Sequence, residues 1–170
     1  MKIQNRITAL FLILIIISVF VVTGCHGTTE LVGFKVPNHF DETKKYEISF
    51  WAKNDTNMNQ VEIYHKAVSD FQKLYPNITV NLKLYTDYGR IYQDVITNIA
   101  TNTTPNVCIT YPDHIATYLK GANTVVPLDS LMADDKYGLG GSEIKFDAPT
   151  SEEIIPKFLN EGKIGNVQYA

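Results

Sequence analysis

The sequence predicts an α/β fold built on a doubly wound, largely parallel sheet. Three short segments of strand-forming residues, 46–51, 78–84 and 107–109, are separated by two segments with apolar residues at helical spacing. Connections of this length join parallel strands through right-handed crossovers. The second segment alternates apolar and polar residues, as edge strands do, whereas the third is uniformly apolar. The expected spatial order is therefore 2-1-3, with the third strand internal and covered on both faces.

The composition is that of a globular chain and argues against a nucleic-acid partner. Hydrophobic residues make up 45% and charged residues 19% of the 170 residues, which is typical of a folded domain. The formal net charge is −3, and no basic cluster suggests contact with phosphates. Two cysteines, Cys25 and Cys108, are too few for a disulfide scaffold.

Residues 1–24 are expected to be a lipoprotein signal peptide outside the fold. Lys2 and Arg6 precede an apolar run over 7–22, which is shorter than the ~20 residues of a spanning helix. The run ends in Val-Thr-Gly-Cys, which resembles a bacterial lipobox. This resemblance implies that Cys25 is the lipid anchor, acylated with a fatty acid such as palmitate, and holds the chain to the bilayer on the extracytoplasmic face of the cell membrane. The alternatives are an uncleaved anchor and an ordinary signal peptide before a structural cysteine.

Residues 25–45 are expected to form a flexible tether between this anchor and the domain. They show no sustained periodicity and contain Gly27, Gly33 and Pro37. His26 and His39 are interpreted as solvated tether residues, because neither has a partner at metal-ligand spacing. The folded part is therefore expected over 46–170.

The first half of the domain is expected to alternate strands and helices. A strand over 46–51 leads into a polar loop, and a helix follows with Asn59 as its cap and Pro76 after its end. After the strand over 78–84, Asp87 is expected to cap a helix over Tyr88–Ala100. The first helix has an apolar face formed by Val61, Tyr64, Val68, Phe71 and Tyr75.

The second half begins with the strand Val107-Cys108-Ile109, which lies between two prolines. Asp113 is expected to cap the helix that follows it, with Ile115, Ala116 and Leu119 on one face. The remaining pattern predicts an edge strand and a helical turn over 125–131, a polar loop over 134–149, a helix over 153–160, and a hairpin over 163–169.

Polar and aromatic side chains follow the first and third strands. Because these strands are expected to be neighbours, their following loops should face one crevice at the carboxyl edge of the sheet. Amide, carboxylate and imidazole groups there suit hydroxyl ligands, and a tyrosine suits the apolar face of a sugar. Each residue also has a purely structural explanation as a turn former, helix cap or surface residue. The expected ligand-binding residues are Asn54, Asp55, Tyr111, Asp113 and His114.

The sequence lacks the patterns of several enzyme classes. No G-x-G-x-x-G follows the first strand, no G-x-x-x-x-G-K-[ST] occurs, and no serine lies in G-x-S-x-G. We therefore expect no cofactor, no metal site and no catalytic residue in this chain.

Several motifs together resemble the extracellular solute-binding proteins of bacterial ABC importers, in the maltose-binding-protein-like group. These are the lipobox, the Ile-Ser-Phe-Trp-Ala strand at 48–52, the Tyr-Pro-Asn-Ile run at 75–78, the Thr-Pro-Asn-Val entry at 104–107, and Val-Pro-Leu-Asp at 126–129. Asn106 stands where the family more usually has aspartate. The resemblance implies a periplasmic-binding-protein-like fold whose loops line a sugar cleft, a membrane permease as partner, and no enzyme activity. It also implies that 46–170 is the amino-terminal, truncated part of a two-domain protein, with an incomplete first domain.

Two other functions remain open from the sequence. One is a membrane-anchored α/β enzyme whose catalytic part lies outside this chain. The other is a eukaryotic secreted domain, suggested by glycosylation triplets that begin at Asn54, Asn77 and Asn102, although the lipobox argues against it. The sequence does not specify which sugar a receptor of this kind binds.

Overall fold

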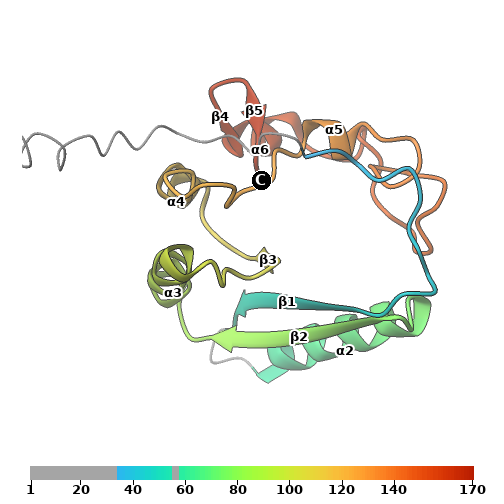
Figure 1. Ribbon diagram of the computed structural model, residues 1–170, viewed down its shortest axis with the longest axis horizontal. Coiled ribbons are helices and arrows are strands. Elements are labelled where there is room, and N and C mark those ends of the chain that lie inside the picture. The colour runs from blue at the N-terminus through green and yellow to red at the C-terminus, as the bar shows by residue number, and fades with distance from the viewer. Residues whose placement is uncertain (1–33, 55–57) are drawn as a thin grey trace, which may run out of the picture.

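A three-stranded parallel sheet with the order β2-β1-β3 forms one layer of the structure, as the sequence predicts (Figure 1). The computed structural model describes residues 34–54 and 58–170. β1 (Tyr46–Lys53) pairs with β2 (Ile78–Tyr85) along its whole length. β3 (Val107–Cys108) pairs with β1 through Phe50 and Trp51 only. Burial alternates along β2, as expected of a strand at a sheet edge.

The helices and a hairpin complete the described chain. α2 covers one face of the sheet, while α3 and α4 lie beside the carboxyl ends of β1 and β2, and the later elements form a second layer (Figure 1). Their bounds are α2 Met58–Leu74, α3 Tyr88–Thr101, α4 Pro112–Tyr118, α5 Asp129–Met132, α6 Pro156–Glu161, β4 Lys163–Ile164 and β5 Val167–Gln168. None of the helices in the described ranges is long and apolar enough to cross a membrane.

The expectation that the third strand is internal and covered on both faces is wrong for the described sheet. β3 is an edge strand of two residues, and Val107 is 51% exposed. A side-chain contact extends the pairing, because Asn106 Oδ1 accepts hydrogen bonds from Ser49 N at 2.9 Å and Ser49 Oγ at 3.1 Å. The apolar run therefore indicates that this segment prefers burial, but it does not indicate which strands lie beside it.

Three expected helix starts are corrected. α2 begins at Met58, so Asn59 lies inside the helix and is not its cap. α4 and α6 begin at Pro112 and Pro156, because a proline at the first helical position gives up an N–H that has no helical partner. Asp113 therefore lies in the first turn of α4 without a capping bond.

The cap of α3 is confirmed, since Asp87 Oδ1 accepts a hydrogen bond from Arg90 N at 2.8 Å. The hairpin is also confirmed, with β4 antiparallel to β5 and Gly165 at a φ of 63° in its turn. The edge strand expected within 125–131 is absent from the described chain. Leu128 N donates instead to Gln168 O at 2.8 Å, and Asp129 Oδ2 accepts from Gln168 N at 3.0 Å, so two bonds attach this segment to the hairpin.

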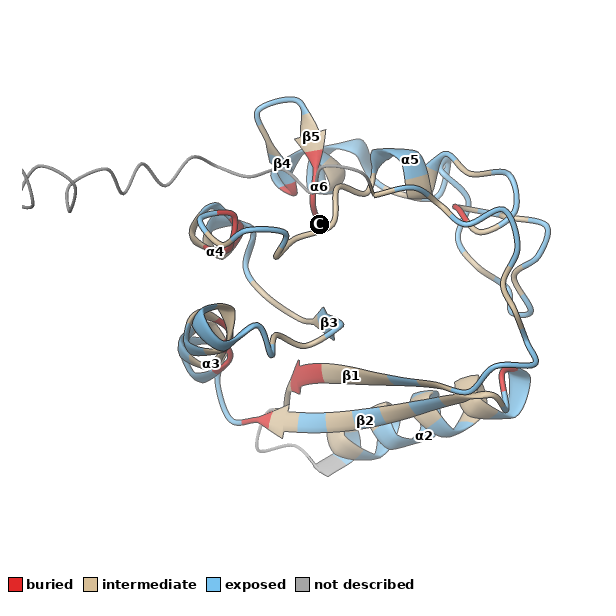
Figure 2. Ribbon diagram, viewed as in Figure 1, coloured by how far each residue is buried: buried red, intermediate tan, exposed pale blue. Residues whose placement is uncertain are grey.

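The core lies where the carboxyl ends of the strands meet α3 and α4 (Figure 2). Its main cluster consists of Trp51, Tyr85, Ile91, Val95 and Tyr118. A second cluster of Ile115, Leu119 and Tyr169 attaches the end of the described chain to α4. Val125 packs against both clusters, so the two form one continuous region.

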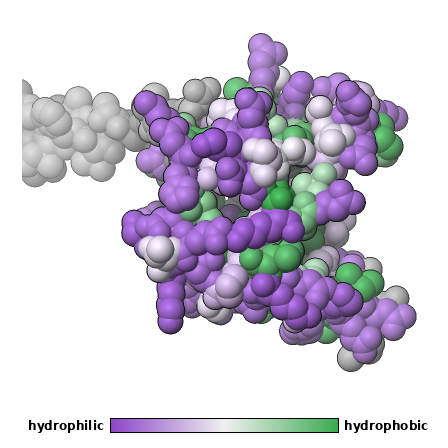
Figure 3. All heavy atoms as spheres, turned by 90° about the vertical axis from the view of Figure 1, so that its right-hand side faces the viewer, coloured by the Kyte–Doolittle hydropathy of each residue, from purple (hydrophilic) through white to green (hydrophobic). Residues whose placement is uncertain are grey.

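The described part of the expected tether contacts the domain. The ring of Phe40 stacks on Tyr46 with centroids 5.1 Å apart, and Phe40 N donates to Tyr137 Oη at 2.7 Å. Glu42 pairs with Lys145 at 2.6 Å. Figure 3 views the side on which this segment runs and shows apolar residues gathered near its middle. Cys25, the signal peptide 1–24 and tether residues 25–33 lie outside the described residues, and the proposed division of the chain stays a prediction.

Shortening Ile91 should test the core. Ile91 is 1% exposed, so we expect Ile91→Ala to lower the free energy of unfolding by about 2–4 kcal/mol through lost apolar contact and a residual cavity. The measurement is urea unfolding followed by far-UV circular dichroism. Ile63 is 64% exposed, and Ile63→Ala is the matched control, with an expected effect below about 0.5 kcal/mol. Equal losses for the two variants would contradict the assignment of Ile91 to the core.

Candidate functional site

Five aromatic side chains form a continuous wall at the carboxyl end of the sheet. The ring of Tyr88 lies against Tyr111, and that of Tyr92 lies against His114, each pair tilted with centroids 4.3 Å apart. Tyr111 meets His114 edge to face at 5.5 Å, and Tyr92 lies 5.9 Å from Tyr118. We call these five residues the aromatic wall.

The helical repeat explains why these rings meet. Tyr88 and Tyr92 are four residues apart on α3, so they share one helix face. Tyr111 precedes α4, while His114 and Tyr118 are four residues apart on it and point from its facing side. Packing of α3 against α4 therefore interleaves the two rows of rings.

Hydroxyl groups hold the inner side of the wall. Thr110 Oγ1 lies 3.3 Å from His114 Nδ1 and 3.2 Å from Tyr118 Oη. Tyr92 Oη donates to Thr117 Oγ1 at 3.3 Å. These contacts restrain rings that the core already supports.

Burial sets the protonation of two neighbouring groups. Burial raises the pKa of Tyr118 to about 12, although its hydrogen bond with Thr110 acts in the opposite direction. Burial also raises the pKa of the Cys108 thiol, which is free and lies on β3. Near neutral pH Cys108 is therefore protonated and is a poor nucleophile.

The end of β1 reaches the same wall. Lys53 Nζ lies 5.6 Å from the ring centroid of Tyr88, and Asn54 N donates to Tyr85 O at 2.9 Å. Asn54 is therefore held next to the end of β2, as expected for a loop at this edge. Asp55 lies outside the described residues.

A hollow of about 570 Å³ opens beside Tyr111 and Asp113, and a volume of this size suits a small ligand. It lies between the start of α4 and the hairpin, and its lining residues are Tyr111, Pro112, Asp113, Ala116, Glu161, Lys163 and Ile164. Tyr111 is 49% exposed, so its ring borders the hollow on one side while Tyr88 supports it on the other. Asp113 is exposed, and its carboxylate makes no hydrogen bond within the described part of the chain.

The sequence missed five residues of this region, Tyr88, Tyr92, Tyr118, Glu161 and Lys163. Tyr88 and Tyr92 were predicted only as part of a helix, although their spacing of four placed them on one face after the second strand. No sequence pattern placed Glu161 and Lys163 at the site, because only the fold brings the hairpin beside α4. Within residues 34–54 and 58–170, no group of three or more histidine, cysteine, aspartate or glutamate side chains could hold a metal ion.

Comparison with known proteins identifies a family and a fold. The model of a family described as bacterial extracellular solute-binding protein matches residues 55–155. A solved structure of an extracellular solute-binding protein family 1 from Alicyclobacillus acidocaldarius subsp. acidocaldarius DSM 446 superposes with a TM-score of 0.57 at 19% identity. The match covers 74% of this chain and 27% of that chain, and it confirms the periplasmic-binding-protein-like α/β fold. No curated protein matched the sequence.

The phenol of Tyr118 should make the free energy of unfolding decrease as pH rises into the alkaline range. Its folded-state pKa of about 12 lies above the ~10 of an unfolded chain, so its contribution is complete below pH 10 and is lost as pH rises toward 12. We expect the free energy of unfolding to fall less steeply over this range in Tyr118→Phe than in the unchanged chain. Urea unfolding at several pH values, followed by far-UV circular dichroism, measures both slopes. Parallel slopes would contradict the raised pKa, and the values at pH 8 serve as the reference for each protein.

Proposed function

Because the chain belongs to the bacterial extracellular solute-binding protein family, we propose that it is the carbohydrate-binding component of an ABC importer. In this role it delivers sugar to a permease in the membrane. The observation that carries the proposal is the aromatic wall, which borders an open hollow at the carboxyl edge of the parallel sheet.

The chemistry of the hollow suits a sugar. A pyranose has an apolar face of C–H groups and a rim of hydroxyls, and the exposed ring of Tyr111 offers a flat surface for that face. Asp113 and Glu161 supply carboxylate acceptors, and Lys163 supplies a donor, at the border of the same hollow. Asn54 and Asp55 follow β1, and we propose that they extend this wall of the site. Binding thus combines ring contact with hydrogen bonds to hydroxyls.

Binding without turnover is part of this proposal. The Thr110 and His114 pair resembles a nucleophile beside a base, with 3.3 Å between Oγ1 and Nδ1. Within the described part of the chain, no carboxylate bonds to His114 to orient its ring, and the Thr110 hydroxyl also contacts Tyr118. The pair is therefore better explained as a support for the wall than as catalytic machinery.

The family is extracellular, and we propose a lipid anchor as the means of retention. In this proposal residues 1–24 direct export, and Cys25 carries the lipid in the outer face of the cell membrane. The proposal rests on the sequence pattern before Cys25, since these residues lie outside the described part of the structure.

Sugar binding is testable by saturation-transfer NMR on the chain with a panel of mono- and disaccharides. The chain spans 27% of the matched structure's length, so we expect a Kd of about 1 mM or weaker, which this method detects. Asp113→Ala should weaken binding by about 1–3 kcal/mol because a hydroxyl partner is lost, and Tyr111→Ala should remove transfer to the sugar C–H protons.

The matched control is Asp147→Ala, which removes an exposed carboxylate from a loop outside the hollow. Transfer that is equal in Asp113→Ala and the unchanged chain would show that Asp113 has no role in binding. Conversion of any sugar during the measurement would favour the enzyme alternative over a receptor.

Anchoring is tested by mass spectrometry of the membrane-extracted protein. We expect an amino-terminal peptide that begins at Cys25 and carries acyl mass. Cys25→Ser should remove the acyl mass and release the protein from the membrane fraction, because the thiol is the attachment point. An unmodified Cys25 peptide in the unchanged protein would refute the anchor.

A further inference from the structure

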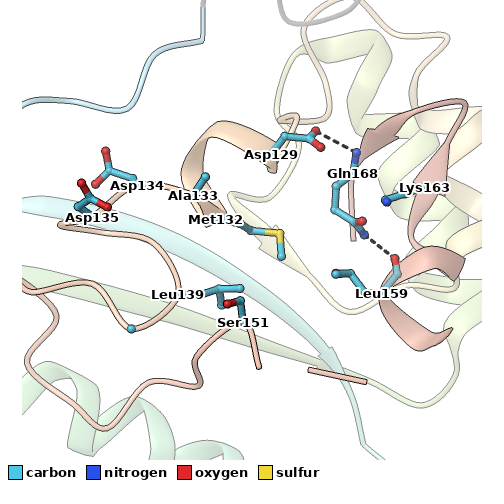
Figure 4. A pocket seen from close by; sticks show the side chains of 11 residues that line it. Asp129, Met132, Ala133, Asp134, Asp135, Leu139, Ser151, Leu159, Lys163 and Gln168 are labelled. Carbon is cyan, nitrogen blue, oxygen red and sulfur yellow. Dashed lines mark hydrogen bonds between the residues drawn. The ribbon is translucent and has the colours of Figure 1, made fainter. Parts of the chain in front are cut away.

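A second pocket, of about 540 Å³, lies between α5, the loop after it, α6 and the hairpin (Figure 4). It is distinct from the aromatic wall, and only Lys163 borders both hollows. Its lining combines three carboxylates with apolar side chains. The carboxylates are those of Asp129, Asp134 and Asp135, and the apolar side chains include Met132 and Leu139.

Gln168 gives this pocket a buried acceptor without a partner. Gln168 is 3% exposed, and its Oε1 has no hydrogen-bond partner among the described residues. Its Nε2 donates to Leu159 O at 2.8 Å and also to Ala170 O. Rotating the amide by half a turn would place Oε1 against these two carbonyl oxygens, so the orientation is fixed. A donor from a ligand in the pocket is one group that would satisfy a buried acceptor of this kind.

Asp129 lies beside Gln168 and adds a charged acceptor. Its Oδ2 accepts a hydrogen bond from Gln168 N at 3.0 Å, while its Oδ1 accepts none within the described chain. Figure 4 shows Asp129 and Gln168 on one side of the pocket, with Asp134 and Asp135 on the other. Met132 and Leu139 lie between the two sides (Figure 4).

The charges and surfaces select the ligand class. Three carboxylates face one ammonium group, that of Lys163, so the pocket favours a cation. A bare metal ion is a poor fit, because the described residues offer no group of three ligands that converge. An ammonium group has three donors and no acceptor, which matches Gln168 Oε1 and the free oxygen of Asp129. The apolar stretch at Met132 and Leu139 suits an alkyl chain.

We propose that this pocket binds a primary alkylammonium compound. The ammonium group donates to Gln168 Oε1 and to Asp129 Oδ1, and the alkyl chain lies along Met132 and Leu139. The carboxylates of Asp134 and Asp135 add attraction from the opposite side. The proposal does not rest on sugar binding at the aromatic wall.

The test titrates the full chain with pentylamine while the methyl resonance of Met132 is followed in protein labelled at its methionine methyl groups. We expect a saturable shift, and pentan-1-ol, which has the same chain without the charge, should bind about tenfold more weakly. Asp129→Asn keeps an oxygen for the Gln168 N–H but loses the charge, so affinity for pentylamine should fall about tenfold. Asp147→Asn removes an equal charge from an exposed loop and should leave affinity unchanged.

A second variant covers the case in which Asp129→Asn disturbs the fold. Gln168→Met removes Oε1 with little change in volume, and circular dichroism melting reports whether either variant stays folded. Lys163→Ala should strengthen pentylamine binding, because a like charge is removed. Absence of a saturable shift in the unchanged chain, equal affinity for pentan-1-ol, or equal losses in Asp129→Asn and Asp147→Asn would overturn the proposal. Saturation transfer to the sugar should be the same in Asp129→Asn as in the unchanged chain. That result would separate this pocket from the proposed sugar site beside Asp113.

Discussion

The packing of α3 against α4 over the carboxyl ends of β1 and β2 is the constraint on which the rest of the structure depends. Ile91 and Val95 of α3, Tyr118 of α4, and Trp51 and Tyr85 from the strand ends form its core. Polar groups also contact this core. Lys83 Nζ lies 4.7 Å from the Trp51 ring centroid and 3.1 Å from Asp94 Oδ2. Because both helices pack on this one cluster, the relative positions of the strand ends and the helix starts are determined together.

The aromatic wall is the outward continuation of that core. Tyr118 belongs to both, and the partly buried Tyr88 and Tyr92 pack directly against the buried cluster. Tyr111, the member of the wall proposed to contact sugar, is therefore supported from behind by Tyr88, which packs against the core. Asp113 has no such support and is exposed, which leaves its carboxylate available to a ligand instead of to the backbone of α4.

The hairpin connects the two hollows of the molecule. Lys163 on β4 borders both, and Gln168 on β5 makes bonds to α6, to Asp129 of α5 and to the segment before it. A two-stranded hairpin has little stability by itself, so these bonds and the packing of Tyr169 on α4 account for its position. Lys163 is the residue of the described chain that borders both hollows.

The sequence by itself determined the parallel α/β layer, the order β2-β1-β3, the Asp87 cap and the hairpin, because these follow from local periodicity, turn residues and the length of the crossovers. It also placed Tyr111 and His114 at the carboxyl edge of the sheet. Asn59 and Asp113 were misassigned as caps, because a side chain that can cap a helix competes with the packing that decides where the helix begins. Only the tertiary structure decided that β3 is an edge strand, that Tyr88 and Tyr92 complete the aromatic wall, and that Glu161 and Lys163 lie beside Asp113. Those contacts join segments far apart in the chain, and their geometry depends on how α3, α4 and the hairpin pack, which no local pattern of residues encodes.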